Sequence, residues 1–172
     1  PPIDAFLEHL EKKVNYRIPG TAVFLASASN GVPPVVMRMV KRFHALHKTV
    51  ILLTVTSENV PYFCKEGEEA SRIDAQDLGQ GFYRVMVRYG FMEVPNIPRV
   101  MEAAFNKLNL YYWARDILYV LGHEPFVEQN SGSMPGTQQT IFAFLSRNAR
   151  NATDYFHLPP EQVIELGTQI DL

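Results

Sequence analysis

Runs of apolar residues alternate with amphipathic segments along this chain, and their lengths predict both strands and helices. Residues 21–26 and 49–56 are apolar at nearly every position, which is typical of strands that are covered on both faces. Between them, apolar residues from Val36 to Leu46 recur at helical spacing after Pro33 and Pro34. The order strand, helix, strand predicts a right-handed β-α-β unit with parallel strands.

The remaining pattern adds elements on both sides of this unit. Helical spacing predicts further helices over 3–14, 95–107 and 138–150. Residues 17–20, which contain Pro19 and Gly20, are expected to end the first helix before the first buried strand. Strand patterns occur at 72–78, 82–91, 116–121 and 163–172, and the first two flank a glycine-rich turn that predicts an antiparallel hairpin. We therefore predict a single α/β domain over residues 1–172, a mixed β-sheet with helices on both faces that includes the β-α-β unit and the hairpin.

Composition narrows the function classes. Hydrophobic residues make up 47% and charged residues 20% of 172, as in soluble globular domains. A net charge of -2 argues against nucleic-acid binding, which normally needs a basic domain. Cys64 is the only cysteine, so the chain can form no internal disulfide and no cysteine-based metal site. The sequence contains no apolar run long enough for a membrane span, and its Pro1-Pro2 start leads us to expect a piece of something longer.

One loop has the composition of a ligand site. Ser27, Ser29, Asn30 and Gly31 lie between the first buried strand and the following helix, where α/β sheets commonly bind ligands and helix N-termini attract anions. The loop matches neither of the two glycine-rich phosphate-binding motifs. A junction whose polar side chains only satisfy backbone groups explains the same residues and is the commoner arrangement. Binding of a phosphate or a nucleotide by this loop remains the alternative interpretation.

Histidine side chains at two places in the sequence are candidates for metal binding or catalysis, but the residues that would complete either site are not found near them. His44 and His47 are three residues apart, and no acidic or cysteine ligand stands near them to complete a metal site. His123-Glu124 follows a strand end, yet the chain has no nucleophile motif that such a pair could serve. We therefore predict no metal, no cofactor, no catalytic residues and no enzymatic activity.

Two surface features complete the candidates. Arg84 and Arg88 share one face of a hairpin strand, where they form either an anion-binding patch or cross-strand pairs with Asp74 or Asp77. The aromatic segment 108–113 either completes the core or supports a homodimer, because aromatic residues are enriched at interface centres.

Several segments in order resemble one protein family. They are Val32-Pro33-Pro34, Glu58-Asn59-Val60-Pro61, Gly81-Phe82-Tyr83-Arg84-Val85, Gly90-Phe91-Met92-Glu93-Val94-Pro95, Gly122-His123-Glu124 and Val163-Ile164-Glu165-Leu166-Gly167-Thr168-Gln169-Ile170-Asp171-Leu172. Together they are similar to the cytosolic C-terminal region of the Kup (KUP/HAK/KT) potassium uptake transporters, over roughly residues 18–172.

The resemblance implies a function for the whole transporter rather than for this chain. The family couples K⁺ entry to H⁺ in a membrane domain that this sequence lacks, so K⁺ should not bind here. We expect a regulatory or assembly domain on the cytoplasmic face of the cell inner membrane, with the transmembrane domain of the same transporter as its partner. The alternatives are a purely structural dimerisation domain, or a nucleotide-sensing module that binds a cyclic dinucleotide as its effector.

Overall fold

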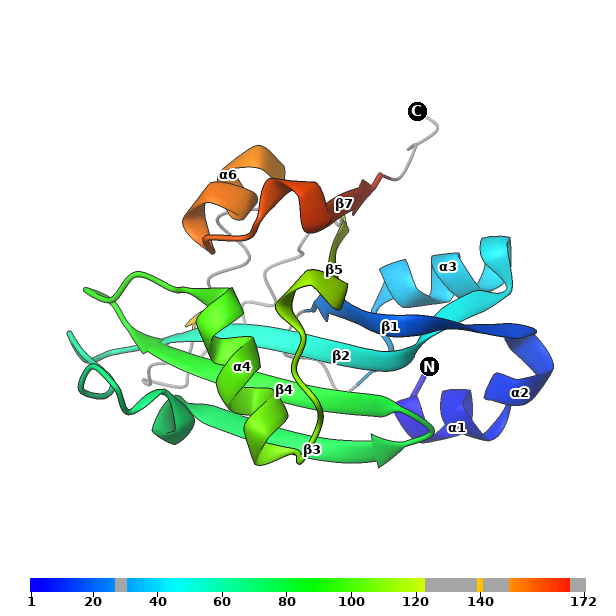
Figure 1. The fold of residues 1–172 in the computed structure, drawn as a ribbon, viewed down its shortest axis with the longest axis horizontal. Coiled ribbons are helices and arrows are strands. Elements are labelled where there is room, and N and C mark those ends of the chain that lie inside the picture. The colour runs from blue at the N-terminus through cyan, green and yellow to red at the C-terminus, as the bar shows by residue number, and fades with distance from the viewer. Residues whose placement is uncertain (27–30, 123–138, 141–148, 168–172) are drawn as a thin grey trace, which may run out of the picture.

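The computed structural model describes residues 1–26, 31–122, 139–140 and 149–167 (Figure 1). The helices are α1 (Ile3–Glu8), α2 (Leu10–Lys13), α3 (Pro34–Phe43), α4 (Ile97–Lys107) and α6 (Ala149–Tyr155). The strands are β1 (Tyr16–Leu25), β2 (Ala45–Glu58), β3 (Ile73–Gly79), β4 (Phe82–Gly90), β5 (Ile117–Gly122), β6 (Gln139–Thr140) and β7 (Val163–Leu166). No helix of the described ranges is both long and apolar enough to cross a membrane.

These strands form one mixed sheet in the order β3-β4-β2-β1-β5-β7, with β6 added beside β2. Strands β4, β2, β1, β5 and β7 are parallel to their neighbours, whereas β3 runs antiparallel to β4 and β6 antiparallel to β2. The unit β1-α3-β2 is the predicted β-α-β unit, and β3-β4 is the predicted hairpin. The predicted fold class is confirmed.

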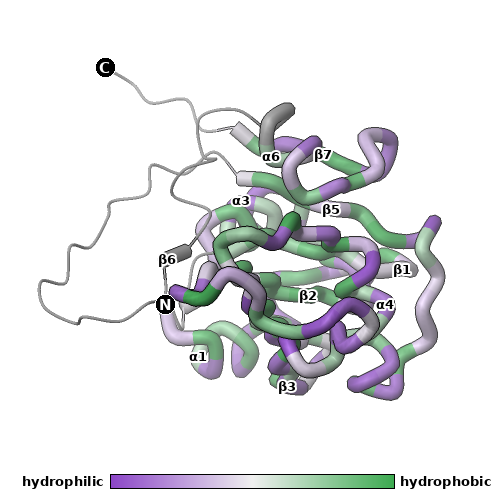
Figure 2. The backbone as a smooth tube through the Cα atoms, turned by 90° about the vertical axis from the view of Figure 1, so that its left-hand side faces the viewer, coloured by the Kyte–Doolittle hydropathy of each residue, from purple (hydrophilic) through white to green (hydrophobic). Residues whose placement is uncertain are grey.

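Helices cover both faces of the sheet, as the continuous apolar runs of β1 and β2 predict. Val23 and Ile51 point to the face that packs against α4 and α6. Phe24 and Leu52 point to the opposite face, which packs against α1, α2 and α3. Figure 2 shows α1 and α3 on one side of the central strands and α4 on the other. Both inner strands are therefore buried on both faces.

The first helical region ends before residue 17, as predicted, but β1 begins at Tyr16, earlier than the predicted strand over 21–26, and passes through Pro19 and Gly20. The register with β2 shifts by one residue between Ile18 and Thr21, which is a β-bulge. Pro19 cannot donate a ladder hydrogen bond, and Gly20 adopts a positive φ of 102° that a side chain rarely tolerates. A bulge accommodates both residues within a strand.

Two of the predicted helices differ from those in the structure. The helix expected over 3–14 is divided at His9 into α1 and α2. The helix expected over 138–150 is wrong at its start, because Gln139 and Thr140 pair with Ser57 and Thr56 of β2. Strand β2 extends beyond the last residue of β1 that pairs with it, so this edge is open to another strand. Residues 141–148 lie outside the described ranges.

The amino end of the sheet is held by Arg17. Its guanidinium donates to the carbonyl oxygens of His47, Lys48 and Gln80 at 2.9–3.0 Å. It also lies over the ring of Phe82, with 5.7 Å from Cζ to the ring centroid. One side chain thus joins β1 and β2 to the hairpin turn.

The hairpin turn offers a matched test of this packing. Gly79 and Gly81 both have positive φ, but a Cβ at Gly81 would overlap the Lys48 carbonyl oxygen, whereas at Gly79 it would meet nothing within 4 Å. Both alanine variants share the left-handed strain, so we expect Gly81→Ala to lower the free energy of unfolding by about 1–3 kcal/mol more than Gly79→Ala. Urea unfolding of the two variants measures the difference, and equal losses would contradict the close approach.

Candidate functional site

The strand order of the sheet has a switch point between β1 and β5. The chain leads from β1 through α3 to β2 on one side, whereas β7, which follows β6 in the sequence, pairs with β5 on the other side. Ligands usually bind at the carboxyl ends of strands at such a switch point. The loops that follow contain Ser27, Ser29 and Asn30 on one side and His123-Glu124 on the other, all outside the described residues.

Gly31 is the described member of the predicted ligand loop. It forms an isolated β-bridge with Pro2, and a Cβ built on it would lie 3.4 Å from the Pro1 carbonyl oxygen. The amide of Val32 donates to the same oxygen at 3.2 Å. The cap residue of α3, Pro33, makes no side-chain hydrogen bond to the helix. The start of the chain therefore packs against this junction.

The two histidines are separated by the end of α3. His44 is the left-handed C-cap residue of that helix, with φ 52°, and is exposed, whereas His47 lies half-buried in β2. The Nδ1 atom of His47 is buried and has no hydrogen-bond partner among the residues that the structure describes. Burial lowers the pKa of His47, and the Asp116 carboxylate opposes this shift only in part. In the part of the chain that the structure describes, no three potential metal ligands gather.

Of the two hairpin arginines, Arg88 makes a cross-strand contact. Arg88 forms an ion pair with Asp74 at 2.5 Å, which confirms the cross-strand alternative for that residue. Its guanidinium also lies over the ring of Phe63, 5.3 Å from the centroid. Asp77 instead accepts a hydrogen bond from the amide of Gly79 at 2.8 Å and so stabilises the turn. Arg84 also has an interaction partner.

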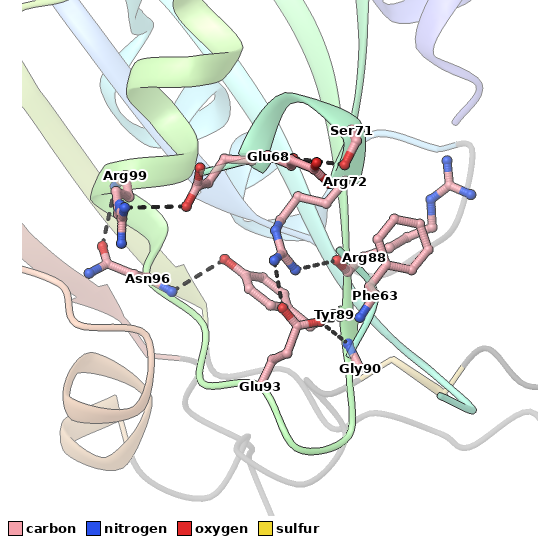
Figure 3. A network of polar contacts seen from close by, with 11 residues as sticks. Phe63, Glu68, Ser71, Arg72, Arg88, Tyr89, Gly90, Glu93, Asn96 and Arg99 are labelled. Atoms are coloured by element: carbon pink, nitrogen blue, oxygen red, sulfur yellow. Dashed lines mark hydrogen bonds and ion pairs between the residues drawn. The ribbon is translucent and has the colours of Figure 1, made fainter. Parts of the chain in front are cut away.

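A buried ion pair that sequence reasoning missed lies at the carboxyl end of β4. Arg72 donates from Nη2 to Oε2 of Glu93 at 2.5 Å, and the two side chains are only 6% and 12% exposed (Figure 3). The other arginine nitrogen, Nη1, donates to the Arg88 carbonyl oxygen at 3.0 Å. The guanidinium also lies over the Tyr89 ring, 4.4 Å from its centroid.

Both members of the pair are charged. Burial disfavours ionised Glu93, but hydrogen bonds from Arg72 and from the amides of Phe63 and Gly90 outweigh it and lower the pKa of this carboxyl. Burial likewise opposes the charge on Arg72, and the contact with Glu93 outweighs it, so the pKa of Arg72 is raised. Burial also raises the pKa of Tyr89 to about 12. None of these groups exchanges a proton near neutral pH, so the cluster suits positioning rather than acid–base catalysis.

The pair fixes two loops against each other. Glu93 Oε1 accepts from the amide of Phe63 at 2.5 Å and from that of Gly90 at 2.8 Å. The amides of Phe91 and Met92 donate to the carbonyl oxygens of Val60 and Pro61, at 2.9 and 3.0 Å. The loop after β2 and the loop after β4 therefore form one unit.

The network continues into α4. The Tyr89 hydroxyl accepts from the amide of Asn96 at 3.2 Å, and the Asn96 side chain caps α4 by accepting from the amide of Arg99. Arg99 in turn lies 3.4 Å from Glu69 in the turn before β3. This chain of contacts orients the start of α4 relative to the hairpin (Figure 3).

Periodicity could not reveal the pair. Arg72 looks like the first residue of a strand, and Glu93 looks like an ordinary loop glutamate. The available signal was the motif Gly90-Phe91-Met92-Glu93, which we noted only as part of a family resemblance. A Cβ at Gly90 would lie 2.6 Å from the Val60 carbonyl oxygen, so this motif needs glycine for the close approach of the two loops.

The aromatic segment 108–113 divides between core and surface. Tyr112 packs edge-on against Phe105 at 5.5 Å and donates to the Pro98 carbonyl oxygen. Tyr111 and Trp113 point outward and are 84% and 60% exposed. The segment borders an open groove of about 470 Å³ that is lined by Glu69, Arg99, Glu102, Ala103, Asn106, Leu110, Tyr111 and Tyr112.

Comparison with known proteins identifies the family. Residues 19–172 match the family described as the K⁺ potassium transporter C-terminal domain. The chain belongs to this family. The resemblance noted in the sequence is thereby confirmed, and the family is one of transporters rather than enzymes.

Relatives of this domain are much longer proteins. It is 42% identical over 171 residues to "Probable potassium transport system protein Kup 1" of Syntrophobacter fumaroxidans, covering 99% of this chain and 25% of the relative. It is 39% identical over 173 residues to the protein of the same name in Geobacter sulfurreducens, covering 99% of this chain and 26% of that one. The chain thus spans about a quarter of the length of these relatives. No solved structure matches it.

Removing one member of the buried pair should be costly. Glu93→Gln leaves the Arg72 charge buried without its carboxylate, so we expect the free energy of unfolding to fall by about 3 kcal/mol. The matched control is Asp74→Asn, which breaks the more exposed pair with Arg88 and should cost less than about 1 kcal/mol. Urea unfolding at neutral pH compares the two variants.

The same variants should differ in pH dependence. Because the pKa of folded Glu93 is below the ordinary value of 4.5, its stabilising contribution is present above that pH and is lost as the pH falls through the folded pKa. Wild type and Asp74→Asn should therefore lose stability in acid more steeply than Glu93→Gln. Parallel pH profiles for all three would contradict a charged, stabilising Glu93.

Proposed function

We propose that this chain is the cytosolic regulatory and assembly domain of a potassium uptake transporter. The observation that carries the proposal is membership of the K⁺ potassium transporter C-terminal domain family over residues 19–172. The relatives named as potassium transport system proteins are about four times as long, which leaves room for a separate membrane domain that carries K⁺/H⁺ symport. That membrane domain is the proposed partner, and the cytoplasmic face of the inner membrane is the proposed location.

The described contacts support a role in transmitting or fixing a conformation. Arg72 and Glu93 form an ion pair with each other, and both also form hydrogen bonds with backbone groups. These contacts hold the loops after β2 and β4 in one arrangement. A buried ion pair contributes little net stability, and its best-attested use is to specify one conformation. A domain that presents a fixed surface to a partner has use for such a pair.

Deleting the domain from the full-length transporter tests the proposal. In cells that lack other K⁺ uptake systems, removal of residues 1–172 should change either the K⁺ uptake rate or the amount of transporter in the membrane. A changed rate at an equal membrane amount indicates regulation, and a reduced amount indicates assembly. The proposal would be overturned if the shortened protein had the same K⁺ uptake rate as the intact protein and were present in the membrane in the same amount.

A nucleotide-sensing module is the second candidate function. The loop with Ser27, Ser29, Asn30 and Gly31 follows β1 at the switch point of the sheet, where α/β domains commonly bind nucleotides. The proposed ligand is a cyclic dinucleotide whose phosphate accepts hydrogen bonds from the amides of residues 29–31 and from the two serine hydroxyls. The backbone N–H groups and helix dipole next to the loop favour an anion.

Titration calorimetry with cyclic di-adenosine monophosphate tests this candidate. Loss of one charge-assisted hydrogen bond should weaken binding by roughly 10- to 150-fold in Ser29→Ala. Gly31→Val should weaken it as well, because a side chain obstructs approach to the backbone. Ser71→Ala, which changes an exposed serine before β3, is the control and should bind like wild type. Unchanged affinity in both loop variants would exclude this loop as the site.

The third form of the proposal is a structural dimerisation domain. Tyr111 and Trp113 support it, because both are exposed and their rings pack edge-on at 6.4 Å. Exposed aromatic side chains of this kind are enriched at interface centres. A homodimer through this surface would be an assembly function that needs no ligand.

A further inference from the structure

The two loops joined by Glu93 carry a cluster of exposed apolar side chains. We define the apolar tip as Val60, Tyr62, Phe91, Met92 and Val94, each between 41% and 66% exposed. The tip lies at the carboxyl end of the sheet, where the loops after β2 and β4 extend together at the left of Figure 1. Grouped exposed apolar residues on a soluble domain mark an interaction surface more often than isolated ones do.

Hydrogen bonds between the two loops, and the inward contacts of Glu93, fix the backbone of the tip. The amides of Phe91 and Met92 are bound to the carbonyl oxygens of Val60 and Pro61, so the two loops cannot separate without breaking these hydrogen bonds. Glu93 lies between the exposed Met92 and Val94, yet its own carboxylate points inward to Arg72, Phe63 and Gly90. Loops whose backbone is fixed before binding lose less entropy when they bind.

The charges around the tip favour a basic partner. The segment 58–69, which contains Val60 and Tyr62, carries four glutamates and one lysine. Glu66 and Glu68 are exposed, while the nearby arginines Arg88 and Arg99 are paired with Asp74 and Glu69. The loop that carries two residues of the tip therefore also carries exposed acidic side chains, Glu66 and Glu68, which we call the acidic margin.

This charge pattern disfavours two other occupants. A second copy of the chain would place the same acidic margin against itself in a two-fold interface, and like charges there repel. The cytoplasmic leaflet of a membrane is negatively charged, so Glu66 and Glu68 would be repelled from a lipid surface. A protein segment that combines apolar and basic side chains would pack against the apolar tip and pair with the acidic side chains of its margin.

We propose that the apolar tip docks on a Lys/Arg-rich cytoplasmic loop of the membrane domain of the same transporter. The inference rests on the proposed function, which supplies that membrane domain as the partner. Cytoplasmic loops of membrane proteins carry an excess of Lys and Arg next to apolar helix ends, which is the chemistry that the tip fits. The Arg72–Glu93 pair then acts as the positioning element of the docking surface.

Photo-crosslinking in the full-length transporter tests this docking. The photoreactive residue p-benzoylphenylalanine replaces Phe91 at the tip, or Tyr16 as an equally exposed control at the start of β1. We expect Phe91 to crosslink to a peptide of a cytoplasmic loop between membrane-spanning segments, and Tyr16 not to do so. Crosslinks from Phe91 to lipid, to a second copy or to residues 1–172 of the same chain would overturn the docking, as would a yield no higher than at Tyr16.

A charge-reversal variant gives an independent readout. Glu66→Lys combined with Glu68→Lys should lower the crosslink yield at Phe91 about ten-fold, because the margin would then repel a basic loop. Glu8→Lys combined with Glu11→Lys, at exposed positions of α1 and α2, should leave the yield unchanged. Equal yields in the two variants would overturn the charge argument. A transporter whose uptake depends on the domain but whose tip does not crosslink would refute the docking alone and leave the proposed function standing.

Discussion

A guanidinium taken out of water needs a carboxylate and well-placed acceptors, and the pairing of Arg72 with Glu93 meets this need at the carboxyl end of the sheet. Because Glu93 also accepts from the amides of Phe63 and Gly90, the loops after β2 and β4 adopt one shared conformation. The start of α4 follows from it through Tyr89 and Asn96. The position of the exposed apolar tip depends on this pair.

The two inner strands of the sheet are covered by helices, so any binding surface lies at the edges or ends of the sheet. Strands β1 and β2 are buried on both faces by α1, α2, α3 and α4, so no ligand can reach the middle of either strand. At the carboxyl end of the sheet, the loops that follow β2 and β4 form the apolar tip. Strands β1 and β5, which flank the switch point, are parallel to each other and end on the same side of the sheet.

The best-defined polar cluster of this chain is one of ionised groups. The chain belongs to the K⁺ potassium transporter C-terminal domain family, and its best-defined polar cluster holds ionised groups whose pKa values are shifted away from neutrality. Such groups hold a conformation and do not relay protons. The buried ion pair therefore maintains the geometry of the two loops that it joins.

The amino-acid sequence by itself determined the fold class, because continuous apolar runs at 21–26 and 49–56 can be buried only between two helical layers. It also determined the hairpin and the family, since both depend on local residue order. The tertiary structure alone decided that Pro19 and Gly20 lie in a bulge, that Gln139 pairs with Ser57, and that Arg72 meets Glu93. Each of these depends on residues distant in sequence, and local periodicity carries no information about which distant groups the folded chain brings into contact.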